Sequence, residues 1–317
     1  MKEIVTIILN WNKPEMTIKT FENIQEIEKN KTDFIIIDNG SEVSEKEKLI
    51  NYAKKNNWRI LNEGDEILEK NENKNVEVIL YNLNKNYGYA KGNNFGLKLA
   101  DFLGYKYAVV ANNDVILEEA VMEKLLHVIL SNEDICVVGP RVIGPNGKRQ
   151  GPFSRPNVFS EFLYPIFYFF IYPFHKLFTI LYEKKISKNE VVYPYRLMGC
   201  FMLIKLDCMK EIGFFDESTF LYAEEPILSE KLKLIGKKTA YRNDVYVKHL
   251  HGVSTIEYGE KKRFLLQLNS DLYYFKEYRK YGKIRLFLVK MGRYYSFFIL
   301  NPIKKSIKNT LKYLKRR

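Results

Sequence analysis

The sequence predicts an α/β fold in which a mostly parallel sheet is flanked by helices. Short apolar, β-branched runs alternate with longer helix-like stretches, and this alternation is typical of parallel sheets. Polar residues gather directly after several of the apolar runs. Since open α/β sheets bind ligands beyond the carboxyl ends of their strands, these polar segments are the first candidates for a functional site.

The amino-terminal half shows the alternation most clearly. Strands are expected at residues 4–9, 34–37, 76–80 and 107–111. The helices expected between them cover residues 14–28, 45–56 and 93–102. The polar segments that follow the first, second and fourth strands are residues 10–12, 38–41 and 112–114.

The second half is more irregular. A helix is expected at residues 118–130, a strand at 135–139 and a loop rich in proline and glycine at 144–156. Residues 205–235 are expected to be mainly helical, and a strand-like run follows at 245–247. Two further helices, at residues 263–281 and 284–300, are expected outside the sheet.

An aromatic segment interrupts this half. Residues 162–174 carry eight aromatic side chains, two prolines and no charge. Extended to residue 181, the segment reaches the length of about 20 residues that a membrane span needs, but its prolines and the pair His175 and Lys176 disfavour a regular span. It is interpreted as a lid or an interfacial element, with a buried helix hairpin as the alternative.

The positive charge is concentrated at the carboxyl end. The net charge is +13, and residues 276–317 alone hold fourteen Lys and Arg against one acid, Glu277. A basic segment of this kind is expected to bind an anionic membrane surface. Solubility alone is an alternative. Nucleic acid is not expected as a partner, because no base-reading motif accompanies the charge.

Cysteine usage and the amino terminus favour a cytoplasmic location. Cys136, Cys200 and Cys208 form an odd set with no C-x-x-C pair, and are interpreted as thiols in a reducing compartment. The chain runs from Met1 directly into a strand-like segment, without the charged and apolar regions of an export signal.

Two constellations could hold a metal ion. Asn112, Asn113 and Asp114 end a strand, where a carboxylate can bind a hard cation that neutralises a diphosphate. Two of the four histidines, His249 and His251, follow another strand, and imidazole is a common metal ligand. A turn or a helix cap is the alternative for the first of these.

Two other constellations are typical of catalysis and phosphate binding. Glu224 and Glu225 are adjacent acids, and burial beside a like charge raises a carboxyl pKa toward the range of a general base. Residues 86–94 include Gly88 and Gly92 ahead of a helix, so that backbone can approach a phosphate there. Solvated acids at a helix start, and a plain turn, are the alternatives.

In their order along the chain, these segments resemble the inverting GT-A glycosyltransferases of glycosyltransferase family 2. The resemblance is to the branch that contains bacterial rhamnosyltransferases and other polysaccharide sugar transferases, and it extends over residues 1–254. The matching segments are residues 5–12, 35–41, 86–96, 109–117, 199–204, 212–217, 220–228 and 249–254.

The resemblance implies roles for individual residues. Asp114 resembles the last acid of the family's D-x-D motif, which binds Mn²⁺ or Mg²⁺, and His249 resembles its metal-side histidine, with His251 as the fallback. Glu225 matches the catalytic base, with Glu224 beside it. The residues expected to bind the nucleotide sugar are Asn10, Asp38, Asn39, Gly88, Lys91, Asn93 and Asn113.

Three departures from the family's pattern stand out. The metal triplet keeps one acid, Asp114, and the base is a glutamate where many relatives have aspartate. A further acid often found two residues after the base is Ile227 here. The first departure weakens the case for a metal, whereas the other two leave the base in place.

The resemblance also implies an organisation and an activity. Residues 1–255 would form the GT-A catalytic domain, with a nucleotide-binding half at 1–115 and an acceptor half at 116–255. Residues 256–317 would form a helical, basic, membrane-proximal extension. The chain would transfer a sugar from a nucleotide-diphosphate donor to a glycan or polyprenyl-linked acceptor at the inner face of the cell membrane. A non-catalytic sugar-nucleotide or glycan-binding protein is the alternative.

Overall fold

A computed structural model describes residues 2–29, 31–65, 77–250 and 259–314, and its sheet is mostly parallel in the amino-terminal half. Strands pair in the order β3-β4-β2-β1-β5-β9-β7-β10-β6, and β8 pairs with β10. The parallel part consists of β1 (Ile4–Asn10), β2 (Asp33–Asp38), β3 (Arg59–Asn62), β4 (Val78–Asn82) and β5 (Tyr107–Asn112). These strands confirm the predicted fold class.

The second half of the sheet is mixed. It contains β6 (Val115–Leu117), β7 (Ile135–Ile143), β8 (Val191–Val192), β9 (Phe201–Lys205) and β10 (Lys238–His249). β9 lies antiparallel between β5 and β7, and β6 lies antiparallel to β10. The strand-like run at 245–247 is therefore the end of a strand of 12 residues.

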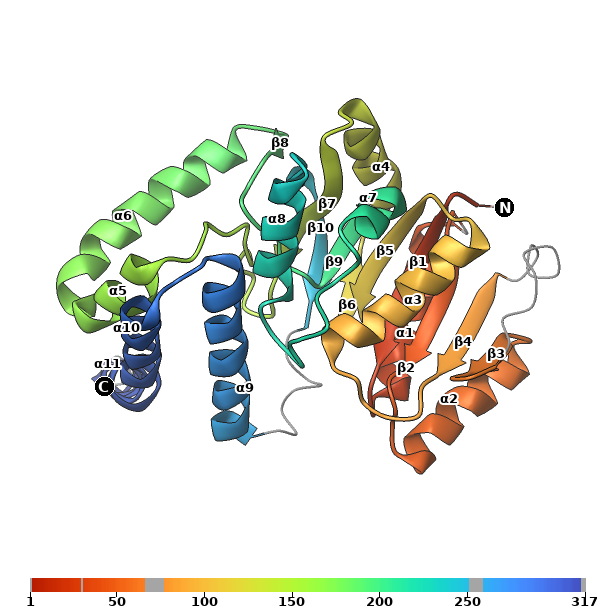
Figure 1. Ribbon diagram of the computed structural model, residues 1–317, viewed down its shortest axis with the longest axis horizontal. Helices are drawn as coiled ribbons and strands as arrows, with labels where there is room; N and C mark the ends of the chain where they lie inside the picture. The colour runs from red at the N-terminus through yellow and green to blue at the C-terminus, as the bar shows by residue number, and fades with distance from the viewer. Residues whose placement is uncertain (1, 30, 66–76, 251–258, 315–317) are drawn as a thin grey trace.

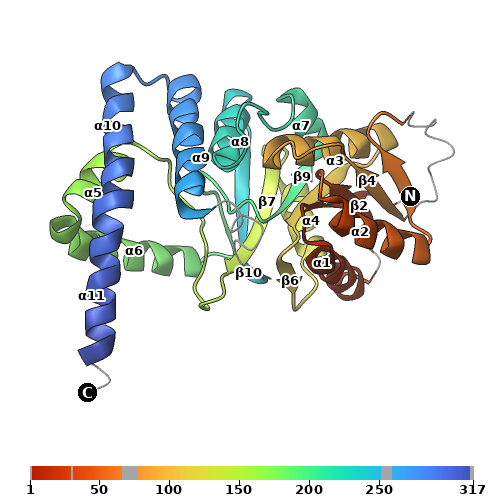
Figure 2. The ribbon, with the colours of Figure 1, turned by 90° about the horizontal axis from the view of Figure 1, so that it is seen from below.

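Helices cover both faces of the sheet. On one face lie α1 (Pro14–Ile27), α2 (Val43–Lys55) and α4 (Met122–Ser131), and on the other lie α3 (Tyr89–Leu103), α7 (Leu206–Glu211) and α8 (Glu224–Leu234) (Figures 1 and 2). Alternation along β1 builds both cores, because Ile8 packs with Phe21 on one face and Ile7 with Leu97 on the other.

Two helical predictions need correction. Residues 205–235 are not one mainly helical stretch, since α7 and α8 are separated by residues 212–223. The helix expected at 93–102 begins earlier, at Tyr89, because Gly88 supplies a positive φ of 82° at its start. The strand predicted at residues 76–80 corresponds to β4, and its predicted first residue, 76, lies outside the described residues.

A helical unit lies at the end of the sheet remote from β3 and β4 (Figure 1). It joins η1 (Phe159–Leu163), α5 (Tyr164–Ile166) and α6 (Tyr168–Ser187) to the carboxyl-terminal elements α9 (Gly259–Tyr273), η3 (Tyr274–Tyr278), α10 (Lys283–Tyr295), η4 (Ser296–Leu300) and α11 (Asn301–Leu314). In the described residues, no helix has the length and apolar character needed to cross a bilayer. The predicted boundary at 255/256 lies outside the described residues.

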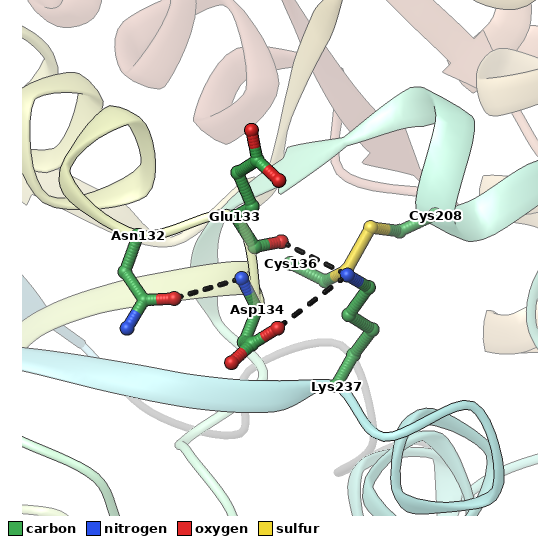
Figure 3. Close-up of a disulfide and its surroundings, with 6 residues drawn as sticks. All are labelled: Asn132, Glu133, Asp134, Cys136, Cys208 and Lys237. Carbon is green, nitrogen blue, oxygen red and sulfur yellow. Dashed lines mark hydrogen bonds and ion pairs between the residues drawn. A yellow bond between two sulfur atoms is a disulfide. The ribbon is translucent and has the colours of Figure 1, made fainter.

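The cysteine prediction is also wrong. Cys136 at the start of β7 and Cys208 in α7 form a disulfide across 72 positions, and only Cys200 remains a thiol, which is buried (Figure 3). Beside the bond, Lys237 donates to the carbonyl of Glu133 (3.2 Å) and lies 3.6 Å from Asp134. Sequence spacing could not show the pairing, since β9 and α7 bring the two cysteines together only in the folded chain.

Candidate active site

A cavity of about 260 Å³ opens where β1 and β5 end at their carboxyl edge. Segments from both halves of the chain meet there, as expected for the ligand-binding edge of an α/β sheet. Its lining residues are Leu9, Trp11, Asn39, Asn86, Gly88, Tyr89, Asn112, Asn113, Asp114, Met198, Gly199, Cys200, Phe220, Leu221, Tyr222, Glu224, Glu225 and His249.

The pairing of β6 with β10 places Asp114 beside His249. Val115 is opposite His249 in the antiparallel ladder, and the Leu250 amide donates to the Asp114 carbonyl at 2.9 Å. Both side chains are buried, and Oδ1 of Asp114 lies 3.2 Å from Nε2 of His249. Two residues that are 135 positions apart in sequence thus face each other across a strand pair.

The chemistry of this pair fits a divalent cation. Gln150 Oε1 lies 2.8 Å from Nδ1 of His249. With the amide oxygen as acceptor, Nδ1 donates to Gln150, and in a neutral ring Nε2 then presents its lone pair to Asp114. Oδ1 of Asp114 is buried and has no hydrogen-bond donor among the described residues. Two facing electron-pair donors suit Mn²⁺, which accepts both carboxylate and imidazole ligands. No group of three or more His, Cys, Asp or Glu side chains occurs at any such site within the described ranges.

A tight turn places two acids at the start of α8. Tyr222 and Ala223 have φ values of 71° and 67°, a left-handed conformation that turns the chain sharply into the helix. Glu225 Oε1 accepts a hydrogen bond from the Gly199 amide at 3.1 Å. A Cβ at residue 199 would lie 2.7 Å from the same oxygen, so that any other residue would displace this side chain from its present position.

The two acids differ in their surroundings. Glu224 is buried, and its Oε1 has no hydrogen-bond partner among the described residues. Burial, and next the charge of Glu225, raise the pKa of Glu224 above its ordinary value. Burial likewise raises the pKa of Tyr89, which lines the same cavity and donates to the Gly199 carbonyl at 2.9 Å. The pair therefore combines a buried carboxyl whose pKa is raised with a second carboxyl that is bound by a backbone amide.

The glycine-rich segment contacts the loop that carries these acids. A Cβ at Gly88 would lie 2.2 Å from the Phe220 carbonyl oxygen, and the Tyr89 amide donates to the same oxygen at 2.9 Å. Asn39 supports the segment from the other side, donating to the Gly88 carbonyl and accepting from the Tyr87 amide. The start of α3 is thereby attached to both the end of β2 and the loop before Glu224.

Comparison with known proteins identifies the family. The model of the family "Glycosyl transferase family 2" matches residues 5–190, more than half of the chain. The chain belongs to glycosyltransferase family 2. Glu224, Glu225 and His249 lie beyond the matched residues. No curated relative matches the chain in sequence.

Solved structures share the fold of this glycosyltransferase. The mannosyltransferase PcManGT from Pyrobaculum calidifontis, in complex with GDP-Man and Mn²⁺, has a TM-score of 0.56 and 12% identity, covering 94% of this chain and 70% of its own. GalNAc-T7 with UDP, GalNAc and Mn²⁺ has a TM-score of 0.56 and 14% identity, covering 95% of this chain and 57% of its own. At such identities the likeness is one of fold.

Most of the predicted site residues meet in the cavity. The lining includes the expected catalytic, metal and nucleotide-binding residues Glu224, Glu225, Asp114, His249, Asn39, Gly88 and Asn113. His251 lies outside the described residues, so its part in the metal site stays a prediction.

Four predicted nucleotide-binding residues of this glycosyltransferase do not line the cavity. Asn10 and Asp38 lie wholly buried beneath it, where Asn10 donates to Asp38 at 2.8 Å and accepts from Thr17. Their side chains support the loop after β2. Lys91 instead lies 3.6 Å from Glu217, and Asn93 donates to the Tyr89 carbonyl. A direct role for these four in nucleotide binding stays a prediction.

Sequence reasoning missed several residues of the site. Met198 and Gln150 carried no recognisable signal, because each depends on contacts made only in the folded chain. Trp11, Tyr89, Gly199 and Phe220 lie inside segments that carry the family resemblance, but their contributions were not singled out. The close approach of Gly199 to Glu225 could be recognised only from the structure.

Proposed function

We propose that this chain is a metal-dependent, inverting glycosyltransferase that uses a nucleotide-diphosphate sugar. The observation that carries the proposal is the meeting of Glu225 with the Asp114–His249 pair in one cavity. The two solved neighbours contain Mn²⁺ with a nucleotide or nucleotide sugar, which supports the same class of donor here.

Asp114 and His249 are the residues that would hold the cation. When bound, Mn²⁺ or Mg²⁺ supplies positive charge that stabilises the departing nucleotide diphosphate. The Gly88 segment brings backbone to the cavity at the start of α3, where amide groups favour phosphate. Asp114, His249 and Gly88 would together bind and orient the donor.

Glu225 would act as the general base. The Gly199 amide holds its Oε1 at the cavity wall, so the carboxylate can take the proton of an acceptor hydroxyl as that hydroxyl attacks the anomeric carbon. A single displacement inverts the anomeric centre. Glu224, held protonated by burial, stays neutral beside the base and limits the repulsion between them.

The acceptor and the location are proposed on separate grounds. We expect a glycan or polyprenyl-linked acceptor of a polysaccharide pathway, in line with the rhamnosyltransferase-like branch that the motifs resemble. The concentration of the net charge in residues 276–317 supports an anionic membrane surface as a partner. On α11, Ile303, Ile307 and Leu311 form an exposed apolar stripe among lysines.

A nucleotide panel tests the donor site. Thermal unfolding would be followed with UDP, dTDP, GDP or CDP, each with and without Mn²⁺, in the wild type and in Asp114→Ala. A ligand at about a hundred times its dissociation constant stabilises a protein by about 2.7 kcal/mol. We expect one nucleotide to stabilise the wild type in the presence of Mn²⁺ and to lose that effect in Asp114→Ala. Stabilisation by none of them would overturn the proposal.

Glu225→Gln separates an enzyme from a binding protein. The donor would be a nucleotide sugar that contains the stabilising nucleotide. We expect turnover by Glu225→Gln, including hydrolysis of the donor, to fall by about 10²–10⁴-fold while the nucleotide-dependent thermal shift persists. Glu211→Gln, an exposed carboxyl on α7, is the matched control. Equal turnover in Glu225→Gln and the wild type would exclude Glu225 as the base.

A further inference from the structure

Helix α6 exposes an unusual number of large apolar side chains. Its exposed members include Phe169, Phe170, Tyr172, Phe174, Leu177, Phe178, Ile180 and Leu181. Phe170 and Phe174 are 80% and 75% exposed. A helix that is apolar on most of its sides is normally buried, so α6 as it stands lacks a covering partner. This exposure excludes the buried hairpin for residues 168–181.

Contacts hold α6 in its first half and near its end. The Tyr164 ring of α5 lies 5.6 Å from the Tyr168 ring at the start of α6 and 4.6 Å from the ring of His175. Near the end, Ile186 is buried in the core on the α3 face of the sheet, and Tyr182 packs against that core. The helix therefore extends from the body as a fixed element, as Figure 1 shows.

The apolar helix adjoins the basic carboxyl-terminal helices. Lys304 of α11 places its Nζ 3.5 Å from the centre of the Tyr168 ring at the start of α6. In both views, α6 and α11 lie at the same end of the molecule (Figures 1 and 2). Helix α10 and η4 expose apolar residues as well, among them Phe287 and Phe298.

The charge around this surface is positive. Residues 301–317 contain seven Lys and Arg and no acid. Two acids of the neighbouring elements are already in ion pairs, Glu161 with Arg293 at 3.0 Å and Glu183 with Arg149 at 3.8 Å. The unbalanced charge next to α6 thus belongs to lysines, which match an anionic surface.

We propose that α6 is the element that enters the membrane interface, while the lysines of α11 contact anionic headgroups. The inference extends the membrane partner proposed above and does not depend on the transferase reaction. Phe and Tyr side chains suit the interface, since their rings are apolar and the tyrosine hydroxyl can remain hydrated. α6 does not meet the requirements of a membrane span, so it inserts only partly.

The proposal rests on two adjacent features that one occupant satisfies. An anionic bilayer covers the aromatic side chains and at the same time neutralises the lysines. A second copy of this chain would bring a second set of lysines to the same face and repel the first. The anionic membrane surface is therefore the occupant favoured by the charge.

Vesicle binding of the full chain tests the proposal. We would measure co-sedimentation with phosphatidylcholine vesicles, with and without phosphatidylglycerol, for the wild type and for the combined variant Phe170→Ser, Phe174→Ser and Phe178→Ser. The wild type should bind the anionic vesicles, and the variant should bind at least about tenfold more weakly. In a separate Phe174→Trp variant, tryptophan emission should shift to shorter wavelength on binding.

A control variant removes three exposed apolar side chains elsewhere. Val43→Ser, Leu130→Ser and Leu234→Ser change side chains that are 74%, 63% and 83% exposed on α2, α4 and α8, and should leave vesicle binding unchanged. Equal binding by the α6 variant and the wild type would overturn the proposal. The proposal would also be overturned if the wild type did not bind vesicles and formed a dimer that the α6 variant converts to a monomer. The nucleotide-dependent thermal shift of the α6 variant reports separately on the donor site.

Discussion

Gln150 is the residue on which the orientation of His249 depends. It accepts from Nδ1 and leaves Nε2 facing Asp114, 3.2 Å away. A partner of this kind sets both the tautomer and the ring direction of a metal-binding histidine. The role is that of a positioning residue, because Gln150 does not line the cavity itself.

Removing Gln150 should weaken metal binding. We expect Gln150→Ala to lower the affinity for Mn²⁺ by about 10–100-fold in calorimetry, whereas Gln150→Glu, which keeps an acceptor oxygen, should retain most of it. Gln267→Ala, at an exposed position on α9, serves as the control. Unchanged affinity in Gln150→Ala would remove Gln150 from the site.

The buried Glu224 should make the stability of the chain depend on pH. Folding raises the pKa of Glu224 above 4.5, so the folded state binds this proton more tightly than the unfolded state. The free energy of unfolding therefore falls as the pH rises from about 4.5 through the raised pKa. In metal-free protein, Glu224→Gln should reduce this fall by more than about 1 kcal/mol between about pH 5 and pH 9, as measured by urea unfolding. An identical pH profile in the variant and the wild type would contradict the prediction.

At the start of α3, the conformation and the packing of Gly88 act together. Gly88 and Gly104 flank this helix and both have positive φ, at 82° and 85°. A Cβ would collide with the Phe220 carbonyl only at Gly88, since nothing lies within 4 Å of a Cβ at Gly104. Gly104 thus has a conformational role alone, whereas Gly88 also lets the helix approach the loop before Glu224.

Alanine at these two positions should have different consequences. Gly104→Ala should cost about 1–2 kcal/mol of stability from the positive φ alone and leave nucleotide binding intact. Gly88→Ala should cost more, because φ 82° with ψ −178° is a conformation that essentially only glycine adopts, and its Cβ also displaces the loop before Glu224, so it should also abolish the nucleotide-dependent thermal shift. Nucleotide binding by Gly88→Ala equal to that of Gly104→Ala would show that the contact with Phe220 is unimportant.

Helix α8 connects Glu224 and Glu225 at its start to the carboxyl-terminal helices. Its Glu230 binds Arg155 through two hydrogen bonds of 2.8 Å and 2.7 Å and accepts from Tyr274 of η3 at 3.2 Å. Ile227 of the same helix packs with Phe275 and Val289. The carboxyl-terminal region is consequently part of the support of the active site, and point variants are better probes of it than truncation.

Across the whole molecule, the disulfide connects β7 to α7. Closing a loop of 72 positions should stabilise the chain by about 4 kcal/mol, so reduction should lower the midpoint of urea unfolding. Alkylation of the denatured, unreduced protein should label one cysteine, Cys200, and reduction should expose all three. If protein quenched in acid directly from cells were alkylated at all three cysteines without reduction, the Cys136–Cys208 disulfide would not form in the cell, in keeping with a reducing compartment.

Most of the order of strands and helices in the amino-terminal half could be read from the sequence, because it depends on local hydrophobic periodicity. β1, α1, β2, α2 and β5 all lie close to their predicted ranges, whereas the short strand β3 was missed. β9 was also missed, since a short strand buried between two others has no alternating pattern of its own. Strand pairing over long distances decided that part of the sheet.

The same division applies to the site. The sequence by itself determined the family and the chemical types of Asp114, Glu225 and His249, because these side chains lie in ordered motifs. Only the tertiary structure decided which polar groups face the cavity, since burying Asn10 and Asp38 beneath it and orienting His249 through Gln150 depend on contacts between segments far apart in the chain. Local motifs specify which types of side chain are present, whereas strand pairing and close packing specify which of these side chains face the cavity.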